Sequence, residues 1–210
     1  VETVQAECGV RPPVDGYLKK LRERCTEVGA LLILDEIQVG FGRTGSLFAF
    51  VQYGIVPDVL LLAKAMGGGM PIGAFVSSKA IMQVLSENPI LGHITTFGGH
   101  PVCCAAALAN LQTLLDTSYI AEVKAKEALF HQLLQHPKIR EVRSAGLLMA
   151  MDLGSFDAVM KVIQYCLAQG LISDWFLFNT ESVRIAPPLI ITEAEIKQAC
   201  GVILEALDKL

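Results

Sequence analysis

Two short apolar runs, each ending on a charged side chain, constrain the fold of this 210-residue chain more than any other feature. Residues 31–34 lead directly to Asp35, and residues 59–63 lead to Lys64. Short runs that are apolar at every position are typical of parallel strands buried on both faces under helices. Because ligands bind beyond the carboxyl ends of such strands, Asp35 and Lys64 are predicted to lie at a ligand site.

The remaining pattern alternates helices with strands. Apolar residues at helical spacing predict a helix over 14–28, which Asp15 could cap and Gly29 could end. A strand is expected over 72–77. Further helices are predicted over 101–115, 119–135, 156–168 and 193–210, and strand-like segments over 142–153 and 183–191. The chain is therefore predicted to have an α/β fold.

Charge and composition limit the class of partner. The net charge is −4 and the pI is near 5.6, so the chain offers no basic surface for nucleic acid or an anionic membrane. A hydrophobic share of 52% is high beside 18% charged residues, which indicates apolar surface that faces another subunit. Small-molecule ligands and an oligomer are the expected partners.

No targeting, membrane or metal signal is found. The N-terminus lacks the basic and apolar segments of a leader peptide, and polar residues interrupt the longest uncharged stretch, 88–115. The six cysteines form no Cys-x-x-Cys pair, which indicates reduced thiols in a cytoplasmic protein. The four histidines lack metal-ligand spacing, so no metal site is predicted.

The chemistry of Asp35 and Lys64 is more specific as a pair than singly. Alone, Asp35 could be a strand-end charge that caps the next turn, and Lys64 could extend from a strand end into solvent. Glycine-rich residues 65–71 follow Lys64 and let backbone and ligand approach closely. A desolvated lysine is a nucleophile toward aldehydes, and a pyridinium ring needs an anion at its nitrogen, so adjacent strand ends could hold both ends of one ring.

Three segments resemble the class III pyridoxal-phosphate aminotransferases, in particular the ornithine and acetylornithine branch. They are Leu34–Gly45 (LDEIQVGFGRTG), Ala63–Ala74 (AKAMGGGMPIGA) and Thr95–Gly99 (TTFGG). The resemblance implies the aspartate aminotransferase-like fold type I, with residues 1–115 as part of the large cofactor-binding domain, mostly parallel in its sheet, and 116–210 as the small C-terminal α/β domain. It extends over nearly the whole chain, but the half of the family that precedes these segments is not in this sequence.

The same resemblance implies roles for individual residues. Lys64 would form the Schiff base with pyridoxal 5'-phosphate and later act as the base, and Asp35 would pair with the ring nitrogen. Ile37 would pack on the ring and Gln38 would reach its hydroxyl.

Thr95 and Thr96 precede a glycine turn and a helix N-terminus, a combination suited to phosphate. In the family this segment reaches the cofactor phosphate of the neighbouring subunit, which implies a homodimer with its active site at the subunit interface. The alternative is a polar loop that caps the following helix.

Arg184 lies in an apolar strand, where an unpaired charge would be costly, so a carboxylate is expected to meet it. It matches the family arginine that binds a substrate carboxylate, and Glu7 matches the glutamate that pairs with this arginine. A structural ion pair is the alternative. The pair would favour an ω-amine donor such as ornithine or acetylornithine and 2-oxoglutarate as acceptor. Thr3, Ala6 and His100 depart from the usual family residues, which affects the substrate assignment rather than the cofactor contacts.

The sequence is also compatible with other functions. Aminomutases and decarboxylases of the family share the cofactor residues, and the chain alone could be a catalytically inert fragment. Residues 40–45 satisfy Gly-x-Gly-x-x-Gly after a strand, which would suggest a dinucleotide-binding oxidoreductase. Five residues separate that strand from the first glycine, and no convincing helix begins at Gly45, so this match is weak.

Overall fold

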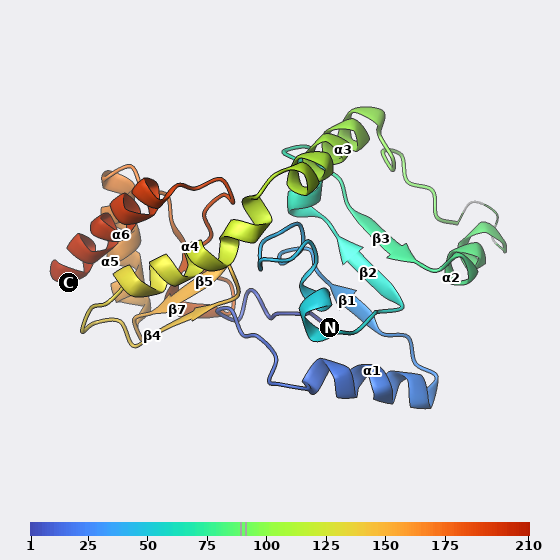
Figure 1. Ribbon diagram of the computed structural model, residues 1–210, viewed down its shortest axis with the longest axis horizontal. Helices are drawn as coiled ribbons and strands as arrows, with labels where there is room; N and C mark the ends of the chain where they lie inside the picture. Colours follow the sequence, from blue (N-terminus) through green and yellow to red (C-terminus); the bar gives the residue numbers. More distant parts are fainter. Residues whose placement is uncertain (89, 91) are drawn as a thin grey trace. The chain divides into compact units, whose positions relative to one another are not determined.

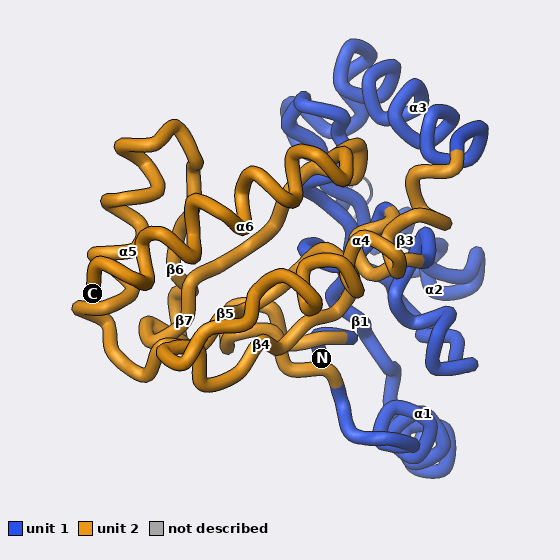
Figure 2. The backbone as a smooth tube through the Cα atoms, turned by 60° about the vertical axis from the view of Figure 1, so that its left-hand side comes forward, with its two compact units in different colours: residues 1–3, 13–41, 46–117 blue, residues 4–12, 42–45, 118–210 orange. Residues whose placement is uncertain are grey.

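The computed structural model describes residues 1–88, 90 and 92–210 and divides into two compact units (Figures 1 and 2). Unit 1 contains residues 1–3, 13–41 and 46–117, and unit 2 contains residues 4–12, 42–45 and 118–210. The short segments 4–12 and 42–45 thus join the C-terminal half of the chain. The predicted division into domains 1–115 and 116–210 stays a prediction. None of the described helices is long and apolar enough to cross a membrane.

Unit 1 is built on a three-stranded sheet with the order β1-β2-β3. Its strands are β1 (Ile33–Asp35), β2 (Val59–Leu62) and β3 (Ala74–Ser77). The two predicted strands, β1 and β2, are confirmed as parallel neighbours, whereas β3 runs antiparallel to β2. Burial on both faces is wrong for β1, because Ile33 is exposed, while β2 is largely buried. The connection over residues 63–73 is too short for the crossover that a parallel pair requires.

The helices of unit 1 are α1 (Tyr17–Val28), α2 (Lys79–Gln83) and α3 (Pro101–Asp116), with 3-10 turns η1 (Ala49–Tyr53), η2 (Lys64–Gly67) and η3 (Val84–Ser86). Helix α1 ends at Gly29 as predicted, since Gly29 adopts a left-handed conformation with φ 70° and donates its N–H to Cys25 and Thr26. The expectation that Asp15 caps this helix is wrong, because Gly16 occupies the N-cap.

Unit 2 is a four-stranded antiparallel sheet with the order β4-β5-β7-β6. The strands are β4 (Glu141–Ser144), β5 (Met149–Asp152), β6 (Asp174–Phe176) and β7 (Asn179–Ile185). The predicted segment 142–153 is a hairpin rather than one strand, because Gly146 turns the chain at φ 65°. The segment predicted over 183–191 ends at Ile185, two residues before Pro187, and the short strand β6 was not predicted.

The two faces of this sheet differ because side chains alternate along each strand. Met149, Met151, Val183 and Ile185 join the hydrophobic core with α4 (Tyr119–Leu133), α5 (Phe156–Ala168) and α6 (Glu193–Asp208), which lie on that side in Figure 1. The opposite face carries Arg143, Ala150, Ser182 and Arg184. Ala150 and Ser182 are fully buried there, and residues 4–12 hydrogen-bond to Arg143 and Arg184 on that face. The N-terminal segment therefore covers the polar face.

Glu36, the residue after β1, is a fully buried carboxylate in unit 1. As expected from strand alternation, it points away from the face of Asp35 and accepts three hydrogen bonds. The donors are the Thr3 hydroxyl at 2.9 Å, the Ala49 N–H at 2.7 Å and the Phe50 N–H at 2.6 Å. Burial raises the pKa of Glu36, while these hydrogen bonds act in the opposite direction.

Replacing Glu36 with glutamine is expected to lower the free energy of unfolding by about 1–3 kcal/mol, because an amide NH₂ must then face a backbone N–H.

The same residue predicts a pH dependence of stability. Since burial raises the pKa of Glu36, its carboxylate binds a proton more tightly in the folded chain than in the unfolded chain. The parent should thus lose stability as the pH rises from about 4.3, the ordinary glutamate pKa, through the raised value. Denaturant unfolding of the parent and of Glu36→Gln across this pH range would measure the stability lost in the variant and the pH dependence of the parent. If the stability of Glu36→Gln fell with pH as steeply as that of the parent, Glu36 would not be the source of the pH dependence.

Candidate active site

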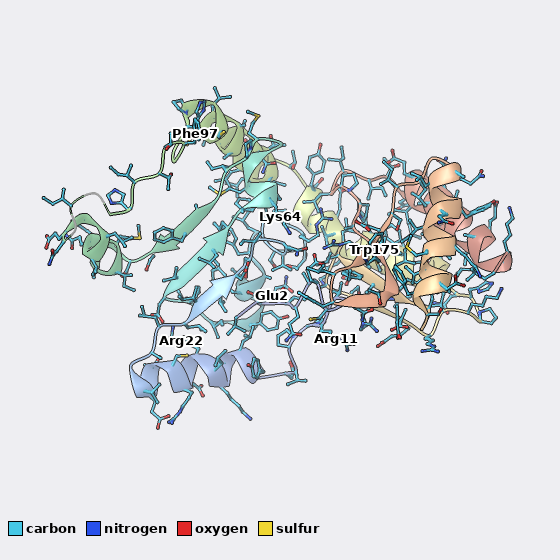
Figure 3. All side chains as sticks on the ribbon, turned by 180° about the vertical axis from the view of Figure 1, so that it is seen from behind. Glu2, Arg11, Arg22, Lys64, Phe97 and Trp175 are labelled. Atoms are coloured by element: carbon cyan, nitrogen blue, oxygen red, sulfur yellow. The ribbon has the colours of Figure 1, made fainter. Side chains whose placement is uncertain are left out.

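The carboxyl ends of β1 and β2 bring Asp35 and Lys64 to one edge of the sheet in unit 1. The parallel register pairs Asp35 with Leu61, and Lys64 follows β2 by two residues. Figure 3 labels Lys64 where the chain leaves this strand. The N-terminal residues extend the sheet beside β1, where the Asp35 N–H donates to Val1 at 2.8 Å. The predicted juxtaposition of the two strand ends is therefore confirmed.

The Asp35 side chain is half-buried and has one oxygen in use. Oδ1 accepts the N–H of Ile37 at 2.9 Å, which fixes the carboxylate against its own turn. Among the described residues, no donor reaches Oδ2. An oriented carboxylate with one open oxygen is suited to accept a hydrogen bond from a cationic ring N–H.

Lys64 is held by an unusual backbone conformation. Its φ of 46° lies in the left-handed region, which non-glycine residues adopt rarely and which is concentrated at functional sites. Helix α3 supports this turn, because the Asn110 side chain donates to the Ala65 carbonyl at 2.8 Å. The lysine is exposed, and the described part of the chain places no hydrogen-bond or ion-pair partner on its amine. The expectation that this chain by itself desolvates Lys64 is therefore not met.

The remaining predicted cofactor residues are found in two places within unit 1. Ile37 and Gln38 follow Asp35 directly and are half-buried. Thr95 and Thr96 are exposed in the loop before α3, and the side chain that caps α3 belongs to His100, whose Nδ1 accepts the Val102 N–H at 3.3 Å. The loop therefore does cap α3, as the alternative expected, but through His100 rather than through the threonines. Their contact with phosphate stays a prediction.

In unit 2, Arg184 forms the ion pair with a carboxylate that was expected for a charge in an apolar strand. Its Nη2 donates to Glu7 Oε1 at 2.6 Å, and its guanidinium lies 5.0 Å from the centre of the buried Phe176 ring. The second oxygen of Glu7 accepts the N–H of Leu177 at 3.0 Å. Both partners are about one-fifth exposed, at 22% for Arg184 and 23% for Glu7. The ion pair is therefore preformed and accessible to a small ligand.

Arg43 makes structural contacts in unit 2 that the sequence did not reveal. Within unit 2 its Nη1 donates to the carbonyls of Leu147 at 2.9 Å and Pro187 at 2.5 Å, and its own carbonyl accepts the Leu147 N–H at 2.9 Å. Burial lowers the pKa of Arg43. A Cβ on Gly146 would lie 2.4 Å from the Arg43 carbonyl, so glycine is required for this close approach.

This arrangement also decides the glycine motif at 40–45. Residues 41–48 form turns and bends, and the next helical element is the 3-10 turn η1, which begins at Ala49. A dinucleotide site requires a helix N-terminus at the glycines. The segment instead connects the Asp35 turn to unit 2. Among the described residues, no group of three or more His, Cys, Asp or Glu side chains could hold a metal ion.

Comparison with known proteins identifies similar chains. The family model for class-III aminotransferases matches residues 1–207. The chain is 44% identical over 217 residues to the putrescine aminotransferase of Pectobacterium atrosepticum, covering 100% of this chain and 46% of that protein.

Solved structures give the same picture. The ornithine aminotransferase of Toxoplasma gondii, crystallized with oxidized glutathione and with partial occupancy of PLP at its active site, matches with a TM-score of 0.89 at 35% identity, covering 100% of this chain and 50% of that one. A transaminase from the marine bacterium Virgibacillus has a TM-score of 0.89 at 32% identity, covering 99% and 52%. The chain thus spans about half the length of these relatives.

Proposed function

Because this chain belongs to the class-III aminotransferase family, we propose that it forms part of a pyridoxal-phosphate-dependent transaminase that moves an amino group from an ω-amine donor to 2-oxoglutarate. The similar proteins named for putrescine and ornithine support a donor of this kind, and acetylornithine belongs to the same chemical class. The observation that carries the proposal is the preformed ion pair between Glu7 and Arg184.

The residues at the two strand ends fit the cofactor. Asp35 offers an open, oriented oxygen to a pyridine nitrogen, and Lys64 offers an amine without a competing partner among the described residues. The glycines after Lys64 allow a close backbone turn, since a Cβ on Gly68 would lie 2.9 Å from the Asn110 side chain. Ile37 and Gln38 continue from the same turn as Asp35, where a ring face and a ring hydroxyl would meet them.

When bound, pyridoxal phosphate supplies an aldehyde that condenses with amines and a ring that withdraws electrons. Asp35 would keep the ring nitrogen protonated by presenting a negative charge to it. Lys64 Nζ would hold the ring at the end of β2. Lys64 Nζ would also act as the general base that takes a proton from the substrate carbon bearing the amine, and as the acid that returns a proton.

The Glu7 and Arg184 pair would let one site accept two unlike substrates. A diamine, or the ω-amine end of an amino acid, leaves Arg184 without a carboxylate, and Glu7 then neutralises the guanidinium. When 2-oxoglutarate binds, its carboxylate would replace Glu7 on Arg184 in a two-pronged pair. Leu177 would still give Glu7 a hydrogen bond after that exchange.

The whole protein is proposed to be a cytoplasmic homodimer with small-molecule substrates only. The high hydrophobic share of the chain supports an oligomer, as do large exposed apolar side chains in unit 1 such as Phe75, Val76 and Phe97. Thr95 and Thr96 would then contact the cofactor phosphate bound by the other subunit. Analytical ultracentrifugation of the full-length protein would test the dimer.

Arg184→Met tests the substrate assignment. The KM for 2-oxoglutarate is expected to rise by roughly 30- to 300-fold, because a charge-assisted contact to its carboxylate is lost, while the KM for putrescine changes little. Steady-state kinetics with putrescine, ornithine and acetylornithine as donors would measure this and rank the donors. Lys197→Met, which removes an exposed lysine of α6, is the control. Equal weakening for 2-oxoglutarate and putrescine would contradict the role of Arg184.

A further inference from the structure

Glu7 lies at the start of a turn whose backbone is strained. Gln5 and Arg11 pair through two hydrogen bonds of 2.9 and 3.2 Å, which closes a narrow loop around Glu7. Inside the loop Gly9 has a φ of 81° and Val10 a φ of 53°. A β-branched residue in the left-handed region is a true outlier, and such a conformation persists only where surrounding groups hold it. The position of Glu7 therefore depends on whatever fixes this loop.

Arg143 on β4 binds this loop at Gly9, next to Val10. Its Nε donates to the Gly9 carbonyl at 2.8 Å, and its side chain is only 11% exposed. The other guanidinium nitrogens bind Glu141 at 2.6 Å, Asp152 at 3.1 Å and Ser182 at 3.0 Å. These partners lie on three strands of the sheet. The guanidinium is thus oriented by partners on β4, β5 and β7.

The sheet register relates Arg143 to Arg184. Both residues pair with Ala150, one from each side, so the two arginines stand in one row on the same face with a small side chain between them. The loop passes over this row, bound to Arg143 at Gly9 and to Arg184 at Glu7. The loop has further contacts. The Phe178 N–H donates to the Glu7 carbonyl at 3.1 Å, and the Cys8 carbonyl accepts from Arg11 Nε at 3.2 Å and from the Asn179 amide at 3.4 Å.

We propose that Arg143 is a positioning residue that sets how firmly Glu7 holds Arg184, and thereby how the protein divides its affinity between substrates with and without a carboxylate. The inference rests on the proposed role of Arg184. Glu7 competes with a substrate carboxylate for the same guanidinium. Loosening the loop should therefore ease the binding of a dicarboxylate. It should also weaken the binding of a diamine, because Arg184 then presents an uncompensated positive charge to a cationic ligand.

The test uses Arg143→Lys in the full-length, cofactor-loaded protein. Lysine keeps the charge but cannot bind Gly9 and the three strand partners together. Glutarate serves as a probe that binds without turnover. Trp175, labelled in Figure 3, is the single tryptophan of the chain and precedes Phe176 and Leu177, which contact Arg184 and Glu7. Its fluorescence, after subtraction of a Trp175→Phe signal, reports glutarate binding.

The expected result is a glutarate Kd about fivefold lower in Arg143→Lys, with a putrescine KM about fivefold higher and little change in kcat. Gly9→Ala should shift both constants in the same directions, since a Cβ there would lie 2.5 Å from the Asn179 amide and 3.0 Å from Arg143. Glu141→Gln is the matched control. It removes one surface partner of Arg143, leaves the Gly9 contact intact and should shift neither constant.

Three outcomes would overturn the proposal: unchanged constants in Arg143→Lys, parallel losses for both ligands, or an equal shift in Glu141→Gln. Arg184→Met separates this failure from failure of the proposed function. If Arg184→Met binds glutarate like the parent, the carboxylate role of Arg184 is wrong, and the role of Arg143 falls with it. If Arg184→Met loses glutarate while Arg143→Lys matches the parent, only the Arg143 proposal fails.

Discussion

Lys64→Ala is expected to abolish transamination in the full-length protein, with kcat lower by about 10⁴-fold, the upper end of what a lost general base costs. The loss is this large because one amine both holds the cofactor and carries the proton. Relief of the left-handed backbone at position 64 offers no compensation, since alanine is also disfavoured there. Steady-state assays with an ω-amine donor and 2-oxoglutarate would measure the change.

A chemical experiment tests the same residue without turnover. Borohydride treatment of the cofactor-loaded parent should leave a covalent label on the peptide that contains Lys64, and none on the variant. Lys79→Ala, at the start of α2 in the same unit, is the control and should label like the parent. A Lys64→Ala protein that still takes up the label elsewhere in full yield would contradict the assignment.

Asp35→Asn is expected to lower kcat by about 10²- to 10³-fold, the range typical of losing one preorganised electrostatic contact. Asparagine has the same shape and can still accept the Ile37 N–H, so the strand end should stay intact. What is lost is the negative charge at the open oxygen. Single-turnover kinetics would show the defect in the chemical step.

The neighbouring carboxylate provides the control for Asp35. Glu36→Gln should lower stability and leave the activity of the folded protein unchanged, because Glu36 is fully buried and bonded to Thr3, Ala49 and Phe50. Asp35→Asn should instead lower the activity and leave the stability unchanged. If the two variants gave the same pattern, the separation of a chemical residue from a structural one at this strand end would be wrong.

Local pattern predicted the parts of the fold that depend on neighbours in sequence. Residues 156–168 form α5 with the predicted bounds, because their apolar residues recur at helical spacing behind a Ser155 cap. Strands β1 and β2 were found from apolar runs. The predictions failed where a turn interrupted a run of strand-like residues, as at Gly146, and where the strand was short, as in β6.

For the candidate site, too, some features were predicted from the sequence and others were seen only in the structure. Asp35 and Lys64 were predicted from the sequence because strand direction and alternation alone put them at one edge of a parallel pair. The pairing of Glu7 with Arg184 was predicted through a family resemblance, and the structure provides its geometry.

The anchors around these residues were decided by the tertiary structure. Arg143 binds Gly9 across 134 positions, Arg43 binds Pro187 across 144, and Glu36 accepts hydrogen bonds from two separate segments, at Thr3 and at Ala49 and Phe50. Burial pattern and strand period are properties of a few consecutive residues, so the sequence by itself determined which residues end the strands. A hydrogen bond between distant groups depends on how the elements pack, and nothing local encodes which carbonyl a guanidinium will meet.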